Sequence, residues 1–375
     1  MSLTVCLLTR NEEQTVARAI ASVRDVAGEI LVADTASSDR TAEVAKDAGA
    51  AVTQFRWEDD FSAGRNDLVA RASGDWILWL DPKEELSRES VEPLRDAMSR
   101  DDAFGYFVQV RHVDESGTRV VAEAADVRLF RRRDDVKFIG RLHPHFDPGV
   151  VDAVKREGLS VGPSDVVLRH YAQPGRSNEA KLRWTARLLE LELRDRPGQL
   201  HYLIEHGRTL LLLNDPRGHD VLAAAADIVL AAREAPRPPS AKVQVLLQHV
   251  LSTDAAGGKF PLDHETAREL ALRWFPASPP LLWMLAEQRF STGEYARAAN
   301  LLERLVRLGK TGTYDRSQAF APGLVGERAL LNVAACYLKL DRPGEAEACL
   351  LQITPTSSLA PVVAKQLATA RRMKG

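Results

Sequence analysis

The chain has 375 residues, enough for two domains that each bury a core of their own. Its 50 lysines and arginines balance 52 aspartates and glutamates, and the formal net charge of -2 argues against a general attraction to nucleic acid or anionic membranes. No apolar run approaches the roughly 20 residues of a membrane-spanning helix. Three cysteines without disulfide or metal spacing complete a composition that predicts a cytoplasmic protein.

The first half of the chain alternates short apolar strands with helices. The expected strands are 3–8, 29–34, 51–55 and 76–81, and the helices between them are 12–26, 41–48 and 62–72. This order, with short connections, predicts a parallel, doubly wound sheet. After a helix expected at 88–100, residues 106–113 and 126–132 alternate like the strands of a mixed or antiparallel extension.

Strand signals end near residue 178, and leucine, alanine and arginine dominate from there. Two segments, 293–302 and 341–350, resemble each other, and each follows an apolar helix and carries a small residue, Ala298 or Ala346, at the expected helix crossing. This pattern is typical of tetratricopeptide-type hairpins, although the two copies are spaced more widely than the usual ~34 residues. We therefore expect an α/β domain at 1–175 and an all-α helical-repeat domain at 176–375, with an irregular helical bundle as the alternative for the latter.

Polar loops follow the expected strands of the first half. They cover residues 9–13, 34–41, 57–66 and 81–84. Ligands of open α/β sheets bind beyond the carboxyl ends of the strands, so these loops are expected to share one site. The sequence has neither a Gly-x-Gly-x-x-Gly after its first strand nor a Walker motif. Acidic loops with one arginine suit a nucleotide diphosphate that is held through a cation.

The order and spacing of these loops resemble the motifs of family 2 glycosyltransferases. The similar segments are 7–13 (LLTRNEE), 32–41 (VADTASSDRT), 60–66 (DFSAGRN) and 74–81 (GDWILWLD). Residues 138–143 (FIGRLH) and the pair 170–171 are similar to later motifs of the subgroup with C-terminal tetratricopeptide repeats. The resemblance implies a GT-A fold with a Rossmann-like mixed sheet. It also implies transfer of a hexose from a nucleotide sugar, usually a UDP-sugar, with inversion and with Mg²⁺ or Mn²⁺.

The resemblance also implies roles for single residues in binding the nucleotide sugar. Thr9 and Glu12 would lie beside the base and the ribose, and Asp34 would accept a hydrogen bond from the uracil N–H. Arg65 would bind the diphosphate or the base carbonyl, because a guanidinium matches both. The alternative for Arg65 is an ion pair with an aspartate of the loop that precedes its helix.

The clearest departure from the family lies after the strand 76–81. Asp81 is the expected metal ligand, and His170 is expected to complete the metal shell. Lys83 stands where the Asp-x-Asp motif has its second aspartate. Three alternatives follow: metal binding through Asp81, Glu84 and His170; metal-independent binding of the diphosphate by Lys83; or loss of donor chemistry.

Inverting transfer needs a general base near the acceptor hydroxyl. Pro144 stands where many relatives have glutamate, so His143, His145 and Asp147 are the candidate bases, and the two histidines also offer an alternative metal site. The sequence thus predicts a glycosyltransferase whose helical repeats present a peptide or protein acceptor or partner. The alternative is a catalytically impaired domain that acts as a nucleotide-binding or scaffold protein.

Overall fold

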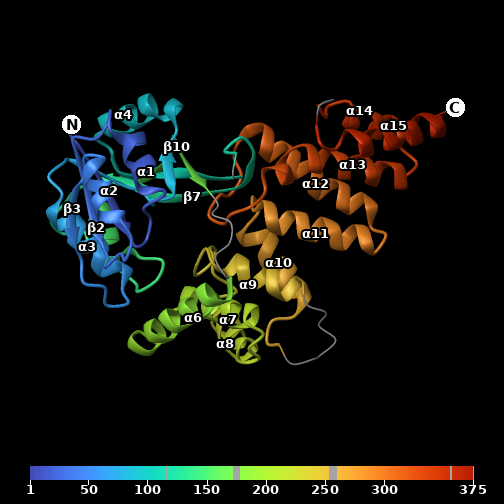
Figure 1. Cartoon of the computed structure of the whole chain (residues 1–375). Helices are drawn as coiled ribbons and strands as arrows, with labels where there is room; N and C mark the ends of the chain where they lie inside the picture. The colour runs from blue at the N-terminus through green and yellow to red at the C-terminus, as the bar shows by residue number, and fades with distance from the viewer. Residues whose placement is uncertain (115, 172–177, 253–259, 355–356, 375) are drawn as a thin grey trace. The chain divides into compact units, whose positions relative to one another are not determined.

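The computed structural model describes residues 1–114, 116–171, 178–252, 260–354 and 357–374. The chain divides into two compact units, Met1–Pro197 and Gly198–Gly375 (Figure 1). The domain boundary predicted between residues 175 and 176 lies outside the described residues. Helix α6 (Asn178–Asp195) groups with the first unit.

The first unit is built on an eight-stranded mixed sheet in the order β3-β2-β1-β4-β7-β6-β10-β5. Its strands are β1 (Leu3–Thr9), β2 (Glu29–Asp34), β3 (Ala51–Gln54), β4 (Trp76–Trp79), β5 (Glu84–Leu86), β6 (Ala103–Val113), β7 (Val120–Arg131) and β10 (Ser160–Tyr171). The first four strands in the order pair in parallel, and β7 is antiparallel to both β4 and β6. The predicted parallel half and its mixed extension are confirmed.

Helices cover both faces of this sheet. They are α1 (Val16–Val23), α2 (Thr41–Asp47), α3 (Phe61–Arg71), η1 (Arg88–Ser90), α4 (Val91–Ser99) and α5 (Pro148–Arg156). Apolar residues of α1, α2 and α4 pack on one face, and those of α3 and α5 pack on the other. A small ribbon of β8 (Phe138–Ile139) and β9 (His145–Phe146) lies beside α3, where the Asn66 side chain bonds both backbone groups of Phe138.

Strand β4 is covered on both faces of the sheet, which explains why its sequence is apolar at every position. Trp76 and Leu78 belong to the core cluster on one face of the sheet, and Ile77 and Trp79 belong to the cluster on the other. A strand that is buried on both faces has no polar side. The run ends at Leu80, whose N–H bonds the carbonyl of Cys6, so Asp81 emerges at the carboxyl edge of the sheet.

Gly74 precedes β4 at a point where there is no room for a side chain. A Cβ at Gly74 would lie 2.7 Å from the backbone nitrogen of Thr4. Gly74→Ala is therefore expected to lower the free energy of unfolding by about 1–3 kcal/mol in urea denaturation. Gly162→Ala is the matched control, because a Cβ at Gly162 would meet nothing within 4 Å. Equal stability of the two variants would show that a methyl group at Gly74 does not clash with the backbone of Thr4.

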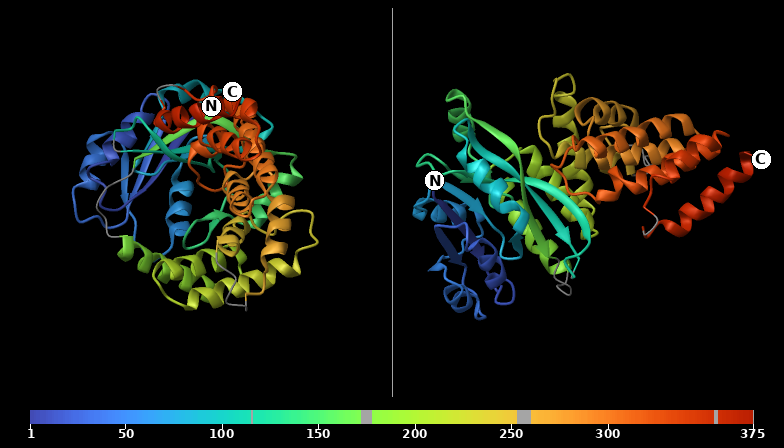
Figure 2. Two further views of the ribbon diagram at one scale, coloured as in Figure 1. Left: turned by 90° about the vertical axis from the view of Figure 1, so that its right-hand side faces the viewer. Right: turned by 90° about the horizontal axis from the view of Figure 1, so that it is seen from above.

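The second unit is helical, as predicted. Its elements are α7 (Leu200–Leu212), α8 (Arg217–Ala231), α9 (Val243–Ser252), α10 (His264–Trp274), α11 (Pro279–Ser291), α12 (Tyr295–Thr311), η3 (Pro322–Val325), α13 (Glu327–Lys339), α14 (Pro343–Leu350) and α15 (Ala360–Lys374). Successive helices from α11 to α14, orange to red in Figure 2, lie against one another. Ala298 and Ala346 are fully buried in the clusters between these helices, as expected for small residues at helix crossings.

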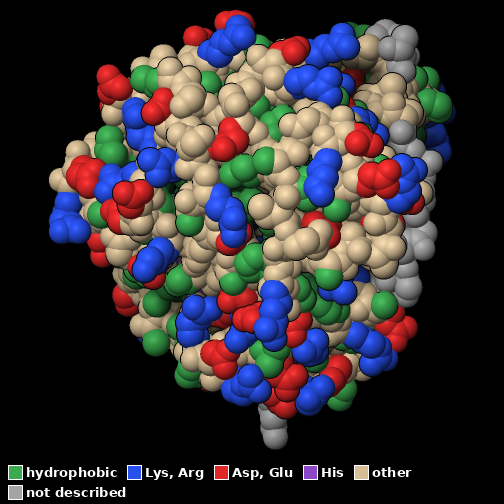
Figure 3. All heavy atoms as spheres, turned by 60° about the vertical axis from the view of Figure 1, so that its left-hand side comes forward, with side chains coloured by type: hydrophobic (Ala, Val, Ile, Leu, Met, Phe, Trp, Pro, Cys, Tyr) green, Lys and Arg blue, Asp and Glu red, His purple; other side chains and the backbone are tan. Residues whose placement is uncertain are grey.

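The surface agrees with the balanced composition. On the face drawn in Figure 3, lysine and arginine side chains are interspersed with aspartate and glutamate, and the residues described there form no large area of one sign. Within the described ranges, no helix is both long and apolar enough to cross a membrane.

Candidate functional site

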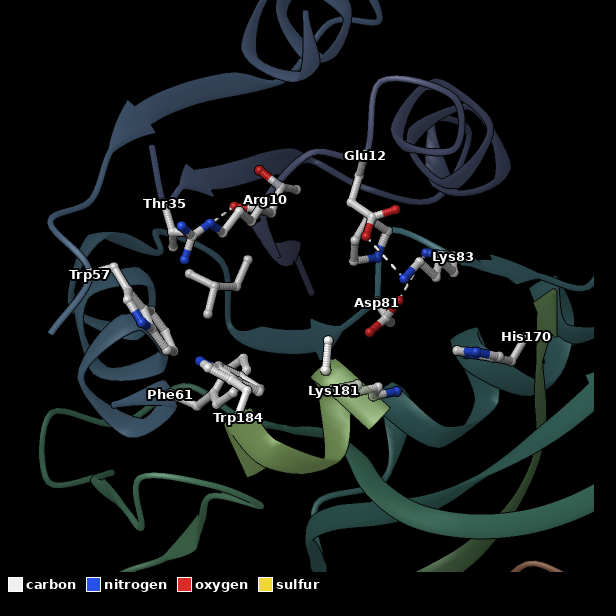
Figure 4. Close-up of a pocket in the computed structure, with 14 residues that line it drawn as sticks. Arg10, Glu12, Thr35, Trp57, Phe61, Asp81, Lys83, His170, Lys181 and Trp184 are labelled. Carbon is white, nitrogen blue, oxygen red and sulfur yellow. Dashed lines mark hydrogen bonds and ion pairs between the residues drawn. The ribbon is translucent and has the colours of Figure 1, made fainter. Parts of the chain in front are cut away.

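An open pocket of about 680 Å³ lies beyond the carboxyl ends of β1, β2 and β4, at the edge where the sequence predicts the site. Figure 4 shows the side chains that surround it. The lining residues are Leu8, Thr9, Arg10, Glu12, Thr35, Trp57, Phe61, Asp81, Pro82, Lys83, His170, Ala180, Lys181 and Trp184. Five of the residues predicted from sequence therefore share the pocket: Thr9, Glu12, Asp81, Lys83 and His170.

The ammonium group of Lys83 is paired with Glu12. Its Nζ lies 3.0 Å from Glu12 Oε1, and the two side chains are 22% and 7% exposed. The second carboxylate oxygen of Glu12 accepts a hydrogen bond from Thr15 Oγ1 at 3.0 Å, which fixes the acid in place. Glu12 thus neutralises the lysine that replaces the second aspartate of the motif, and the pair adds no net charge to the pocket.

Asp81 is held by a tight turn that leaves one of its oxygens open. The backbone N–H of Lys83 donates to Asp81 Oδ1 at 2.9 Å, and the N–H of Asp81 donates to Glu84 Oε2 at 2.9 Å. Asp81 Oδ2 accepts no hydrogen bond from any residue that the structure describes. An open carboxylate oxygen in a pocket is a ligand for a hard cation.

Glu84 lies behind the pocket, with only 2% of its side chain exposed. Its Oε1 lies 3.5 Å from Arg128 Nη2 and 3.6 Å from His170 Nδ1. Burial alone would raise the pKa of Glu84, but Arg128, His170 and the Asp81 N–H together hold that pKa below its usual value. Glu84 does not line the pocket, so it supports Asp81 and His170 from behind and is not placed to be the third metal ligand that the sequence suggested.

His170 sits between this buried acid and the pocket. Its ring centroid lies 4.8 Å from that of His112, whose pKa is lowered chiefly by burial and then by His170. With Nδ1 directed at Glu84, the other ring nitrogen remains for a ligand in the pocket. A carboxylate behind a metal-binding histidine is the usual way in which proteins orient such a ring.

Asp34 is buried at the end of β2 and does not line the pocket. Its carboxylate accepts hydrogen bonds from Thr9 Oγ1 at 3.3 Å, from the Ser37 N–H at 3.0 Å and from Ser37 Oγ. These bonds join the loops that follow β1 and β2. They occupy three of the roughly four acceptor positions of a carboxylate. Because Asp34 does not line the pocket, its bond to the uracil N–H, which the resemblance implies, stays a prediction.

Arg65 lies on α3, away from the lining of the pocket. Its guanidinium stacks over the rings of Trp79 at 4.5 Å and Phe138 at 5.2 Å and donates to the Pro144 carbonyl at 3.4 Å. Burial lowers the pKa of Arg65 to about 10, so it remains charged at neutral pH. The alternative ion pair is not formed, because Asp60 caps α3 and Asp59, on the preceding loop, pairs with α6.

The three candidate bases lie on the segment around β9. His143 is exposed with a positive φ of 49°, and burial lowers the pKa of His145, which keeps its imidazole neutral. Asp147 caps α5 by accepting from the Gly149 N–H at 2.8 Å. The lining of the pocket includes none of the three, and their role as base stays a prediction.

Sequence reasoning missed an aromatic wall and a lysine. Trp57 and Phe61, from the loop before α3 and its first residue, contact each other and the α6 residue Trp184. Lys181, one turn before Trp184, lines the pocket as well. Trp57 and Phe61 lie in a loop already expected at the site, whereas the two α6 residues fall beyond the predicted domain boundary.

The metal-binding side chains in the pocket are too few to hold a divalent ion unless a bound substrate or water supplies further ligand atoms. Among the described residues, no group of three or more histidine, cysteine, aspartate or glutamate side chains is arranged to hold a metal. Asp81 and His170 offer one carboxylate oxygen and one imidazole nitrogen in the pocket. Mg²⁺ is commonly bound by one or two carboxylates together with substrate phosphates and water, and Mn²⁺ also accepts imidazole.

Comparisons with known proteins show which family the first part of the chain resembles. Residues 4–159 match the family described as Glycosyl transferase family 2. A TPR repeat-containing protein of Synechococcus elongatus is 36% identical over 172 residues, which are 45% of this chain and 42% of that protein. The SPbeta prophage-derived glycosyltransferase SunS of Bacillus subtilis is 26% identical over 145 residues, which are 38% of this chain and 34% of that protein. The chain thus matches less than half the length of these two relatives.

A solved structure of glucosyl-3-phosphoglycerate synthase from Mycobacterium tuberculosis, in complex with Mn²⁺ and uridine-diphosphate-glucose, is 17% identical. The match covers 51% of this chain and 77% of that chain with a TM-score of 0.35, an overall similarity too low to assign a function.

The sheet order, the helices on both faces and the pocket at the strand ends are those of a GT-A fold. Residues 4–159 match the model of family 2 glycosyltransferases, and a helical region follows them. The resemblance seen in the four loops is confirmed.

Proposed function

We propose that the protein transfers a sugar, expected to be a hexose, from a nucleotide-sugar donor to an acceptor with inversion. UDP is the expected nucleotide. The observation that carries this proposal is the open carboxylate oxygen of Asp81, which lies beside His170 in a pocket at the strand ends of a family 2 glycosyltransferase domain.

Charge favours a metal-assisted mode of donor binding. The carboxylate of Asp81 would repel a diphosphate beside it, and Lys83 does not offset this charge because Glu12 already pairs with it. Arg10 and Lys181 also line the pocket and would attract a diphosphate, but they come from other segments than the turn that holds Asp81. A divalent ion on Asp81 and His170 would remove the repulsion and, when bound, would neutralise charge on the departing diphosphate. We propose Mg²⁺ or Mn²⁺ as this ion.

The nucleoside end of the donor is proposed to lie near Thr9 and Thr35. Thr9 donates a hydrogen bond to the carboxylate of Asp34, and Thr35 follows Asp34 in the chain. The remaining acceptor position of this carboxylate would take the base N–H. Arg65 does not line the pocket, but its buried positive charge interacts with Asp81 and Glu84 and favours an anionic ligand at that edge without direct contact. The helical second unit is proposed to present a peptide or protein acceptor or partner.

Calorimetric titration of the full chain with UDP, with and without Mn²⁺, tests the proposal. We expect Mn²⁺ to increase the affinity for UDP in this titration. In a separate UDP-release assay, we expect Mn²⁺ to increase the rate at which UDP is released from UDP-glucose. Equal affinity with and without Mn²⁺ would favour the second candidate, direct binding of the diphosphate by Lys83. If UDP binds under neither condition, the transfer proposal fails for UDP-sugars and the scaffold role is favoured.

Glu12→Gln tests whether the ion pair restrains Lys83. The variant keeps the acceptor for Thr15 but frees the ammonium group, so metal-free affinity for UDP is expected to rise roughly 3- to 10-fold while the enhancement by Mn²⁺ falls. Glu13→Gln is the matched control, since Glu13 is exposed and does not line the pocket. If both variants bind metal-free UDP as the wild type does, Lys83 is not held back by Glu12.

A further inference from the structure

The aromatic wall of the pocket faces the charged residues across the opening. Figure 4 shows Trp57, Phe61 and Trp184 on one side and Asp81 with Lys83 on the other. The rings of Trp57 and Trp184 are nearly parallel, with an angle of 29° and centroids 6.3 Å apart. Among the described residues, none of the three aromatic side chains belongs to the core clusters of the first unit.

Polar contacts fix this wall in place. The Trp57 indole N–H donates to Asp59 Oδ1 at 3.1 Å, and Arg187 of α6 binds Asp59 Oδ2 at 2.6 Å. The same aspartate therefore orients Trp57 and ties α6, with Trp184, to the loop before α3. A preordered aromatic surface loses little side-chain entropy when a planar ligand stacks on it.

The C-terminal end of α6 is anchored to the rest of the first unit as well. Arg141 pairs with Asp195 at 2.7 Å, and its backbone N–H donates at 2.8 Å to Glu192, whose side chain is fully buried. These contacts hold the helix at both ends of its second half. In the first half of the helix, the ring contacts of Trp184 with Trp57 and Phe61 place that side chain relative to the loop before α3.

Lys181 and Trp184 are three residues apart, so they lie on the same face of α6. Lys181 is exposed to the pocket and forms no ion pair with any described residue. Figure 4 shows its side chain extending away from Trp184 toward the side of the pocket that holds Asp81 and His170. A ligand that spans the pocket would meet an aromatic surface at one end, where Arg10 and Thr35 also lie, and the cation of Lys181 closer to the acidic edge.

We propose that α6, which lies beyond the matched family 2 domain, completes the nucleotide site. Trp184 stacks with the base and Lys181 binds the diphosphate. The assignment rests on the function proposed above, and it follows from the order of groups along the pocket. The aromatic wall lies at the end with Thr35, beside the strand that ends in Asp34, and the lysine lies toward Asp81, as a nucleoside diphosphate requires.

Titration of the full chain with UDP and with uridine, in the presence of Mn²⁺, tests this assignment. Trp184→Ala is expected to weaken both ligands by the same factor, about 5- to 100-fold, because base stacking on an aromatic ring is lost from each. Trp184→Phe is expected to stay within about 3-fold of the wild type, since a ring remains. Lys181→Ala is expected to weaken UDP about 3- to 5-fold and to leave uridine unchanged.

Arg183→Ala is the matched control, because it removes one positive charge from the same helix at an exposed residue that pairs with Glu179. Melting temperatures show whether each variant is folded. If the wild type binds UDP and folded Trp184→Ala binds it equally well, the role of α6 is overturned while the transfer proposal stands. If the wild type binds neither ligand, both proposals fail together.

Discussion

Replacing Glu84 with alanine is expected to lower the free energy of unfolding by about 3 kcal/mol or more. The variant leaves Arg128, whose side chain is 15% exposed, with the exposed carboxylate of Asp126 as its one remaining ion-pair partner among the described residues. It also removes the acceptor of the Asp81 N–H. Removing one member of a buried ion pair is strongly destabilising because the remaining charge has lost its compensation. Urea denaturation at neutral pH measures the change.

Glu89→Ala is the matched control for this prediction. Glu89 pairs with Arg169 at 3.4 Å, and both side chains are largely exposed, so its loss is expected to change stability by less than about 1 kcal/mol. Glu84→Gln should fall between the two, because the amide keeps an acceptor for the Asp81 N–H but no charge for Arg128. A cost for Glu84→Ala no larger than that for Glu89→Ala would show that the buried pair does not stabilise the fold.

The fold was predictable where local pattern and burial coincide. The run from Trp76 to Leu80 has no polar residue because both faces of β4 are covered, and its end alone places Asp81 at the edge of the sheet. The loops after β1 and β2 converge for the same geometric reason, since β1 pairs in parallel with both β2 and β4. Position along a strand thus identified most of the pocket.

What the sequence did not reveal depends on contacts between distant segments. Lys83 next to Asp81 predicts repulsion of a metal, but its partner Glu12 comes from the loop after β1, and local spacing does not report that pair. Glu84 resembles a metal ligand in sequence, whereas its burial against Arg128 directs it away from the pocket. Trp184 follows a change from mixed to helical texture, which hid its association with the first unit.

Asp81→Asn is expected to abolish the enhancement of UDP affinity by Mn²⁺ and to slow the release of UDP from UDP-glucose by about 100-fold or more. The amide keeps an oxygen that can accept the Lys83 N–H, so the turn is preserved, but it offers a cation no negative charge. Calorimetry and a UDP-release assay measure both effects. Asp152→Asn, an exposed position on α5, is the control. Retained metal dependence in Asp81→Asn would exclude Asp81 as the ligand.

The variant Lys83→Asp, alone and combined with Glu12→Gln, distinguishes metal-assisted from metal-free binding. It restores the acidic residue of the motif but strips Glu12 of its partner, so three carboxylates would face the same pocket. Like charges at ~4 Å cost about 4 kcal/mol at an effective dielectric of 20, and metal-free affinity for UDP is therefore expected to fall below that of the wild type. Adding Glu12→Gln to Lys83→Asp removes the surplus charge and should recover this loss while keeping a strong response to Mn²⁺. If Lys83 instead serves as the cation, the double variant would still lack metal-free binding, because no ammonium group remains at that position.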